Sequence, residues 1–245
     1  MIRAVRAELL KLRTTRMVLW LALLILGLAG FVVSISAGST ASSDLTSVGD
    51  QRALVEFAGS AALIALIVGI SAMAGEFAHG TIAHTFLVVP VRERVVAAKL
   101  VAGAIAGVTL AVFMEAVTLA LVAVWLSAKS VPSHLASHEV VLTLGGILAA
   151  AALSGAIGIG YGAVLRRQTP AIVIALIWLL VGEPVLGFAA GAQKYAPGHV
   201  LASVVESGHQ GSILLDFWPG VALALGYTVV LALAGALVVS RTDVA

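Results

Sequence analysis

Two carboxylate side chains lie inside apolar stretches of this sequence, where ionisable groups are unusual. Glu115 falls near the middle of the apolar run 100–126, and Glu183 falls towards the end of the run 171–190, directly before Pro184. An ionisable group in lipid is costly unless it is paired, hydrated or protonated. Each carboxylate therefore either lines a polar path or is a structural group in the bundle interior. For Glu183 the structural interpretation is favoured, because Pro184 bends the helix and frees a backbone carbonyl near the outer water layer.

The other residues that could do chemistry form no recognisable reaction centre. His134 and His138 have the i, i+4 spacing of a metal pair, but their short loop fits a solvated segment better. Ser60 and Ser154 lie in apolar runs, yet no histidine lies within a run to act as a base. The sequence also contains no cysteine, no GxxxxGK(S/T) phosphate-binding loop and no HExxH motif. We therefore predict that the chain has no catalytic, cofactor-binding or metal site of its own.

The composition indicates an integral membrane protein. Of the 245 residues, 61% are hydrophobic and only 11% are charged, whereas a soluble domain has about 25% charged residues. The mean hydropathy of +1.12 exceeds what a soluble chain of this length could bury. The net charge of +2 gives no support to a nucleic-acid partner.

Six apolar runs are each long enough to cross the roughly 30 Å hydrocarbon layer as a helix. Spanning segments of this kind must be helical, because no water is present in the bilayer to satisfy their backbone groups. The predicted fold is therefore an all-α polytopic membrane protein that forms one transmembrane domain over residues 1–245. The expected spans are residues 17–37, 57–75, 100–126, 140–165, 171–190 and 217–239.

Small residues and a tryptophan inside these runs predict how the helices pack. Gly103 and Gly107 lie one turn apart in the third run, and Gly158 and Gly162 do so in the fourth. Such pairs let helices approach closely in lipid, and contacts within the chain are favoured over a dimer contact. Trp178 lies away from the ends of its run and is expected to pack inside the bundle.

The basic residues predict an orientation. Residues Ile2–Arg16 combine helical apolar spacing with basic residues on the other faces, which predicts an amphipathic helix in the membrane interface. A cytoplasmic N-terminus puts eleven Lys and Arg residues inside and three outside, and this asymmetry predicts that both termini lie in the cytoplasm. The expected location is the plasma membrane. The inner residues are Arg3, Arg6, Lys11, Arg13, Arg16, Arg92, Arg94, Lys99, Arg166, Arg167 and Arg241, and the outer ones are Arg52, Lys129 and Lys194.

Two outer segments differ in character. Residues Ala37–Arg52 are rich in Ser, Thr, Asp and Gly, which predicts a mobile loop. In Pro197–Gly208, the proline at the start and the glycine at the end predict a short helix at the outer surface.

The segment Glu76–Lys99 is the break in hydropathy that carries a charge cluster between two apolar runs. Gly80 and Thr81 are suited to a break and a helix N-cap, so a short apolar helix is expected from Ile82 until Pro90 ends it. A short apolar helix on the cytoplasmic side either lies in the interface or docks in a groove on a soluble partner.

Two motifs in the chain resemble those of one family, the ABC transporter permeases of the type-2 exporter class. The resemblance to their first cytoplasmic loop is carried by Glu76-Phe77-x-x-Gly80-Thr81-Ile82, then Leu87-x-x-Pro90-x-Arg92, then Lys99. The resemblance to their opening amphipathic helix is carried by Arg6-Ala7-Glu8-x-x-Lys11-x-x-Thr14-Thr15-Arg16.

The resemblance implies a permease without ATPase machinery that works with a separate ATP-binding cassette subunit, which would bind the ATP. It also implies a second permease copy, identical or not, and surrounding membrane lipids. The loop after the second span would then be a coupling segment that fits a cleft on the ATPase. The residues implied for that segment are Glu76, Gly80, Thr81, Ile82, Phe86, Leu87, Pro90, Arg92 and Lys99.

Two other classes of protein are weighed against an exporter subunit. A stand-alone secondary carrier or channel would normally show paired charges, broken helices and an internal repeat, whereas this sequence has one Pro-interrupted run and no evident repeat. A membrane-embedded enzyme is disfavoured by the lack of histidine within the runs. The sequence does not specify a substrate, beyond hydrophobic, lipid-like, peptide or drug-like compounds as candidates.

Overall fold

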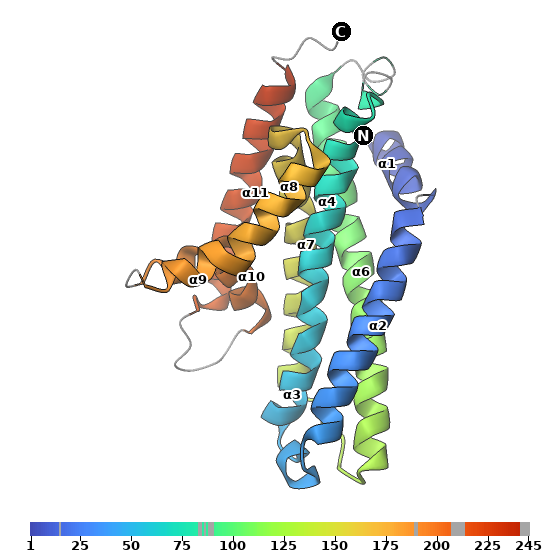
Figure 1. The fold of residues 1–245 in the computed structure, drawn as a ribbon, viewed down its shortest axis with the longest axis vertical. Coiled ribbons are helices and arrows are strands. Elements are labelled where there is room, and N and C mark those ends of the chain that lie inside the picture. Colours follow the sequence, from blue (N-terminus) through green and yellow to red (C-terminus); the bar gives the residue numbers. More distant parts are fainter. Residues whose placement is uncertain are drawn as a thin grey trace.

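A computed structural model of the protein describes residues 1–14, 16–82, 85, 87, 91–188, 191–206 and 214–240. Within these residues the chain forms helices and turns, and no strand. Long helices stand side by side in an upright bundle, and the N-terminal helix lies at the same end as the last turn of the final long helix (Figure 1). This arrangement agrees with an even number of crossings.

The helices account for every apolar run that the sequence predicts to span. They are α1 (Ile2–Thr14), α2 (Arg16–Ser39), η1 (Ser42–Leu45), α3 (Val48–Glu56), η2 (Phe57–Ser60), α4 (Ala61–Ala78), α6 (Arg92–Ala128), α7 (His138–Leu165), α8 (Gln168–Ile177), η3 (Trp178–Gly182), α9 (Glu183–Leu186), η4 (Gln193–Tyr195), α10 (Pro197–Val205) and α11 (Phe217–Ser240). The prediction of an all-α polytopic membrane protein is confirmed.

Five helical stretches within the described residues are long and apolar enough to cross a membrane. They are Val48–Ala78, Glu93–Ala128, His138–Leu165, Gln168–Leu186 and Phe217–Val239. The helix α2 provides a further apolar segment, Leu23–Ser39. At 24 residues, α2 is roughly 36 Å long at 1.5 Å per residue, which exceeds the roughly 30 Å hydrocarbon layer.

The expected mobile loop 37–52 is wrong, because much of it is helical. The helix α3 begins at Val48, where Ser47 and Asp50 form a capping box that satisfies the first free N–H groups. The side-chain amide of Gln51 is fully buried, and its Oε1 accepts a hydrogen bond of 2.8 Å from the backbone N–H of His134. These contacts fix the outer segment against the turn between α6 and α7.

Glycine residues bring α7 into backbone contact with both α4 and α6. A Cβ atom on Gly103 would lie 2.8 Å from the carbonyl oxygen of Gly155, and one on Gly107 would collide with the carbonyl of Ala151. A Cβ atom on Gly158 would collide with the carbonyl of Leu66 in α4. Such close approach is possible only without a side chain. The prediction that these glycines pack helices within the chain is confirmed.

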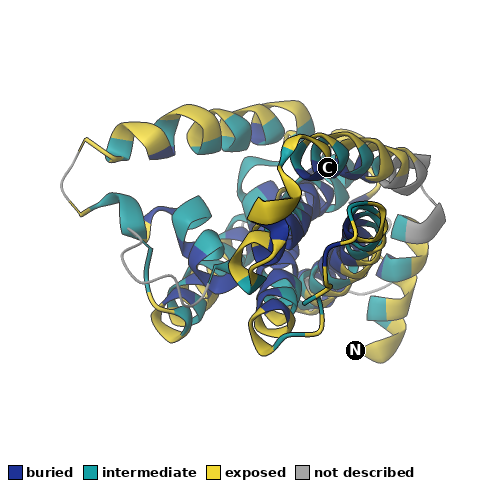
Figure 2. Cartoon of the chain, turned by 90° about the horizontal axis from the view of Figure 1, so that it is seen from below, coloured by how far each residue is buried: buried dark blue, intermediate teal, exposed yellow. Residues whose placement is uncertain are grey.

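Apolar side chains face outward from this bundle, as they do in a protein surrounded by lipid. Buried residues gather in the middle when the bundle is viewed from below, and exposed residues lie around the rim (Figure 2). Phe31 is 67% exposed, Leu180 is 73% exposed and Leu233 is 60% exposed. Apolar surface of this extent is compatible with a hydrocarbon environment and would be unfavourable in water.

The glycine contacts generate a stability prediction. Gly155→Ala places a methyl group against the carbonyl of Gly103, and overpacking of this kind typically costs about 1–3 kcal/mol. Gly145→Ala is the matched control, because it lies in the same helix and has no atom within 4 Å of the added carbon. Thermal unfolding in detergent should show a clear loss for Gly155→Ala and none for Gly145→Ala. Equal midpoints for the two variants would contradict the close α6–α7 contact.

Candidate functional site

A buried ammonium group joins three helices at the end of the bundle where α1 lies. Lys99, in the third turn of α6, is only 1% exposed. Its Nζ lies 2.5 Å from Oε2 of Glu8 on α1 and 2.8 Å from Oε1 of Glu76 on α4. Glu8 and Lys99 are 91 positions apart in the sequence, so only the tertiary fold brings them together.

A second lysine completes a network of four charges, which we call the ion-pair cluster: Glu8, Lys11, Glu76 and Lys99. The Nζ of Lys11 donates to Oε1 of Glu8 at 2.8 Å and to Oε1 of Glu76 at 2.9 Å. It also lies 3.4 Å from Oγ1 of Thr85, in the segment beyond α4. Two carboxylates and two ammonium groups leave the cluster neutral, so every charge has an opposite neighbour.

Burial and pairing act in opposite directions on the ionisation of this cluster. Burial alone would raise the pKa of Glu8, but the charges of Lys99 and Lys11 outweigh it and hold that pKa below its usual range. Burial likewise opposes the charged form of Lys11, and hydrogen bonds to Glu8 and Glu76 raise its pKa overall. A carboxylate with a lowered pKa stabilises the fold at neutral pH, and that stabilisation is lost as the pH falls from the ordinary carboxyl pKa through the lowered one.

The cluster faces a cavity of about 980 Å³ between α1, α4 and α6. Of the four charged side chains, Lys11 is the most accessible, at 45% exposure, and Lys99 is the least, at 1%. His79, Thr81 and Gln168 also line it, and Gln168 donates from Nε2 to Oγ of Ser71 at 3.2 Å. The cavity therefore places polar side chains from both ends of the 76–99 segment around one space.

The start of the segment after α4 has the predicted break. Gly80 adopts a left-handed φ of +67°, which ends α4 and which other residues adopt only with strain. Ile82 is helical and only 2% exposed, whereas Leu87 is helical and 84% exposed. One apolar residue of the segment is thus anchored in the bundle and another points away from it.

Only some of the residues predicted for the segment 76–99 contact one another in the structure. It brings Glu76 and Lys99 into direct contact, and the hydroxyl of Thr81 donates to the carbonyl of Glu76 at 3.4 Å. Phe86 and Pro90 lie outside the described residues. Arg92 is the first residue of α6, which starts well before the predicted span that begins at residue 100.

Sequence reasoning did not assign Glu8 and Lys11 to the site, although the N-terminal motif contains both. The available signal is their i, i+3 spacing on an amphipathic helix that is otherwise basic. Glu8 is the only acidic residue of α1, and a lone carboxylate on such a helix indicates a specific partner. That partner is visible only once α1 is seen to cross α6.

The buried carboxylate Glu115 lies apart from the cluster. It follows Lys99 by sixteen positions along α6, which is roughly 24 Å at 1.5 Å per residue. It is 8% exposed, and its Oε1 has no hydrogen-bond partner among the described residues; the same is true of the hydroxyl of Thr118, one turn further along. Glu115 therefore faces the protein interior and not lipid.

The contacts of Glu183 favour the structural interpretation. Its Oε1 accepts a hydrogen bond of 2.6 Å from the backbone N–H of Gly198, in the first turn of α10. Its Oε2 lies 3.0 Å from Nδ1 of His199, whose Nε2 lies 2.7 Å from Nε2 of Gln193. A carboxylate at the start of a helix is stabilised by the free N–H groups there. Glu183 thereby ties the fifth predicted span to α10, a helix that starts at Pro197 as predicted.

The comparison with known families matches most of these elements. The model of the family described as "ABC-2 family transporter protein" matches residues 4–182. The match includes the ion-pair cluster, the segment 76–99 and the helices as far as η3. No curated protein matches the chain.

The burial of Lys99 generates a prediction about α1. Lys99→Met leaves two buried carboxylates with one partly exposed ammonium group, and breaking a buried ion pair typically costs about 3–5 kcal/mol. Lys11 is 45% exposed at its side chain, so Lys11→Met should cost about 0–1 kcal/mol. Trypsin cleavage after Arg6, followed by mass spectrometry, should accelerate by roughly a hundredfold in the first variant and little in the second. Equal rates in both variants would show that Lys99 does not hold α1.

Proposed function

The chain belongs to the ABC-2 family of transporter proteins, and we propose that it is the permease subunit of an ATP-driven exporter whose ATPase is a separate chain. The observation that carries this proposal is the ion-pair cluster. Lys99 and Glu76 form the two ends of the segment 76–99, and the cluster joins both ends to α1. A partner that pushes on this segment therefore moves the ends of α1, α4 and α6 together.

Transmission of movement from the segment 76–99 to the membrane requires a rigid connection at the base of the segment. The backbone contacts of α7 with α4 and α6 connect that base to the spanning part of the bundle. A displacement of the segment is then transmitted along whole helices and is not absorbed in a flexible joint. This is how an ATPase outside the membrane would change the arrangement of helices within it.

The docking surface is the exposed side of the segment. Leu87 presents a large apolar side chain that is 84% exposed, and apolar anchors of this kind typically dominate an interface. The family resemblance adds Phe86, Pro90 and Arg92 to the surface. Gly80 supports it by ending α4, and Ile82 anchors it in the bundle.

The remaining features of the proposal follow from this role. ATP binds to the partner, so the chain needs no catalytic, cofactor or metal site and is not itself an enzyme. The segment 76–99 and both termini face the cytoplasm of a cell bounded by the plasma membrane, in agreement with the distribution of basic residues. Residues 1–245 form one permease domain, which pairs with a second permease copy.

A copurification experiment tests this function. Leu87→Ala should fold and insert normally but lose about ten- to a hundredfold in affinity for the ATPase, which corresponds to about 1–3 kcal/mol. Leu233→Ala is the matched control, because this leucine is 60% exposed on α11 and away from the segment. Both variants and the wild type are purified from their native membranes in mild detergent, and ATPase activity is assayed in the eluate.

The outcome separates an exporter subunit from a stand-alone carrier. The proposal predicts ATPase activity with wild type and Leu233→Ala, and a strong loss with Leu87→Ala. If wild-type protein brings down no ATPase, or if Leu87→Ala retains it fully, the stand-alone carrier becomes the better explanation.

A further inference from the structure

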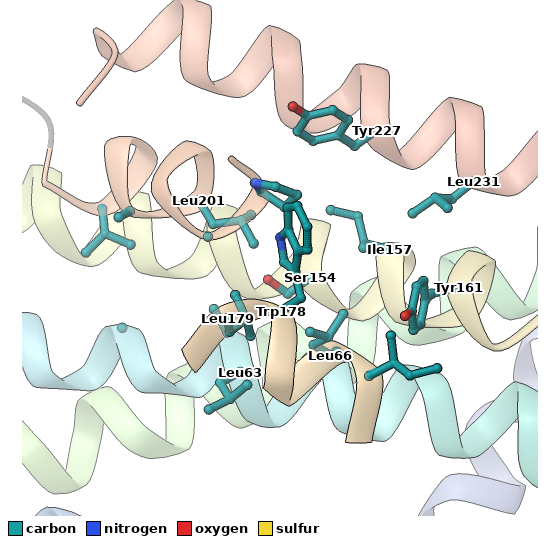
Figure 3. A pocket seen from close by; sticks show the side chains of 18 of the residues that line it. Leu63, Leu66, Ser154, Ile157, Tyr161, Trp178, Leu179, Leu201, Tyr227 and Leu231 are labelled. Carbon is teal, nitrogen blue, oxygen red and sulfur yellow. The ribbon is translucent and has the colours of Figure 1, made fainter. Parts of the chain in front are cut away.

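A second cavity, of about 630 Å³, lies within the spanning part of the bundle between α4, α7, the α8–η3 helix, α10 and α11. Aliphatic side chains such as Leu63, Leu66 and Leu231 make up much of its lining, and the rings of Tyr161 and Trp178 border the same space (Figure 3). Its volume falls in the range of about 300–1,000 Å³ that is typical of small-molecule sites. The cavity therefore suits a ligand that is largely hydrocarbon.

The hydroxyl group of Tyr161 has no hydrogen-bond partner among the described residues, although it belongs to the lining of this cavity. The tyrosine ring packs against the apolar cluster of Ile70, Ala74 and Ala171, which holds the ring in place. The residue is half-buried, and its oxygen is not among the polar atoms that are closed off from the surface. An accessible hydroxyl on a packed ring can donate a hydrogen bond to a ligand.

The indole N–H of Trp178 is a second donor in the lining without a partner in the described part of the chain. Trp178 begins the π-helical turn η3, and such turns frequently occur at functional sites. A Cβ atom on Gly182 would lie 2.9 Å from Cε3 of the indole, so the ring packs on the glycine backbone by the edge opposite to Nε1. Because Trp178 keeps 44% of its surface exposed, the expectation that it packs tightly inside the bundle is wrong.

The depth of Trp178 in the membrane makes an unpaired indole N–H unfavourable. Arg166 and Arg167 precede α8 and mark one edge of the membrane. Trp178 lies ten residues after the start of α8 at Gln168, which is roughly 15 Å along the helix at 1.5 Å per residue. This is near the middle of the roughly 30 Å hydrocarbon layer, where no water can satisfy the group. An indole N–H can only donate, so a ligand that satisfies it must carry a hydrogen-bond acceptor.

The charged side chains of the cavity lie at its other end. Glu56 and Glu206 line it, and each interacts with another group of the protein. No Lys, Arg or His is among the described residues of the lining. A Cβ atom on Gly59, which is close to Glu56 in the chain, would lie 4.0 Å from Ile147, and Tyr161 follows Ile147 along α7 by roughly 21 Å at 1.5 Å per residue. The two free donors therefore lie in a part of the cavity without charge, which favours an uncharged ligand.

We propose that this cavity binds an uncharged amphiphile whose hydrocarbon body carries hydrogen-bond acceptors, such as ester or ketone oxygens. The body lies against the aliphatic lining and the indole of Trp178. The acceptors receive hydrogen bonds from the Tyr161 hydroxyl and the Trp178 N–H. The inference rests on the proposed function only where it makes this ligand the exported substrate, and binding itself requires neither ATP nor the partner subunit.

Fluorescence of Trp178 provides a direct assay of binding. Trp20, Trp125 and Trp218 are replaced by Phe, and the permease is placed in nanodiscs of ether-linked phospholipid, which has no ester carbonyl to compete. The probes are a dibrominated fatty acid methyl ester and a dibrominated alkane of the same chain length, because bromine quenches tryptophan fluorescence on contact. A second single-tryptophan protein that keeps only Trp218, which is 76% exposed, reports quenching by probe dissolved in the bilayer.

The ester should quench Trp178 with a saturable curve, whereas the alkane, which has no acceptor, should need about tenfold more for half-saturation as a mole fraction of the bilayer. A brominated alkyl trimethylammonium and a brominated alkyl sulfate of the same length should both bind more weakly than the ester. Trp218 should show only a gradual, non-saturable response to every probe.

Two matched variants test the hydroxyl of Tyr161. Tyr161→Phe removes only this hydroxyl, so it should weaken binding of the ester by about fivefold and leave binding of the alkane unchanged. Tyr227→Phe is the control, because Tyr227 lines the same cavity but its hydroxyl already donates to the carbonyl of Tyr195. The affinity for the ester should be the same in Tyr227→Phe as in the parent protein.

The ester oxygens of the surrounding bilayer are a second source of the same chemistry. The titration is therefore repeated in nanodiscs of ester-linked phospholipid with the same head group. An unchanged half-saturation point indicates a ligand distinct from the bulk lipid, and a several-fold rise indicates that a bilayer lipid occupies the cavity. Both results support the proposed chemistry and separate its two sources.

Four results would overturn the inference. They are quenching of Trp178 that follows the same non-saturable curve as Trp218, equal affinity for the ester and the alkane, tighter binding of either charged probe, and unchanged binding of the ester in Tyr161→Phe. If the ester binds as expected but no ATPase copurifies with the chain, the cavity assignment stands and the exporter function fails. If an ATPase copurifies and the ester does not bind, the exporter function stands and this assignment fails.

Discussion

The ammonium group of Lys99 is the constraint on which the cytoplasmic end of this protein depends. A buried charge is tolerated only beside opposite charges, and at 1% exposure Lys99 has no water to replace them. Glu8 and Glu76 supply those charges from two other helices. Removing α1 or α4 would leave the buried ammonium group with only one of its two carboxylate partners. The pairing therefore selects one arrangement of α1, α4 and α6, and with it the geometry of the segment 76–99.

The glycine contacts extend this arrangement into the membrane. Lipid provides no hydrophobic driving force between helices, so close packing must supply the cohesion. Gly155 and Gly158 of α7 allow backbone contact with α6 and α4 respectively. The same close packing is absent around η3. There, an apolar cavity of about 630 Å³ lies between the fifth predicted span and the helices α4, α7 and α11. The bundle is thus tight where force would be transmitted and open where a ligand would lie.

The sequence predicts those parts of this structure that the bilayer itself dictates. Run lengths and hydropathy identify every long helix, because a spanning segment has few alternatives. The prediction fails where water replaces lipid, as in the outer segment that the buried amide of Gln51 holds. It also fails for the partners of Lys99, since nothing local indicates that α1 crosses α6. The π-helical turn at Trp178 has no sequence signature, so the cavity could not be predicted.

If the ion-pair cluster couples the helices, α1 and the start of α6 move as one unit when the partner acts on the segment 76–99. The chain contains no cysteine, so spin labels can be placed only at Arg6→Cys and Arg94→Cys, two exposed positions on α1 and α6. Pulsed electron resonance on the complex with its ATPase then measures the distance between them. The account predicts one narrow distance that is the same without nucleotide and with trapped ATP, and that broadens in Lys99→Met. A distance that changes with ATP in the otherwise wild-type chain, or that stays narrow in Lys99→Met, would contradict it.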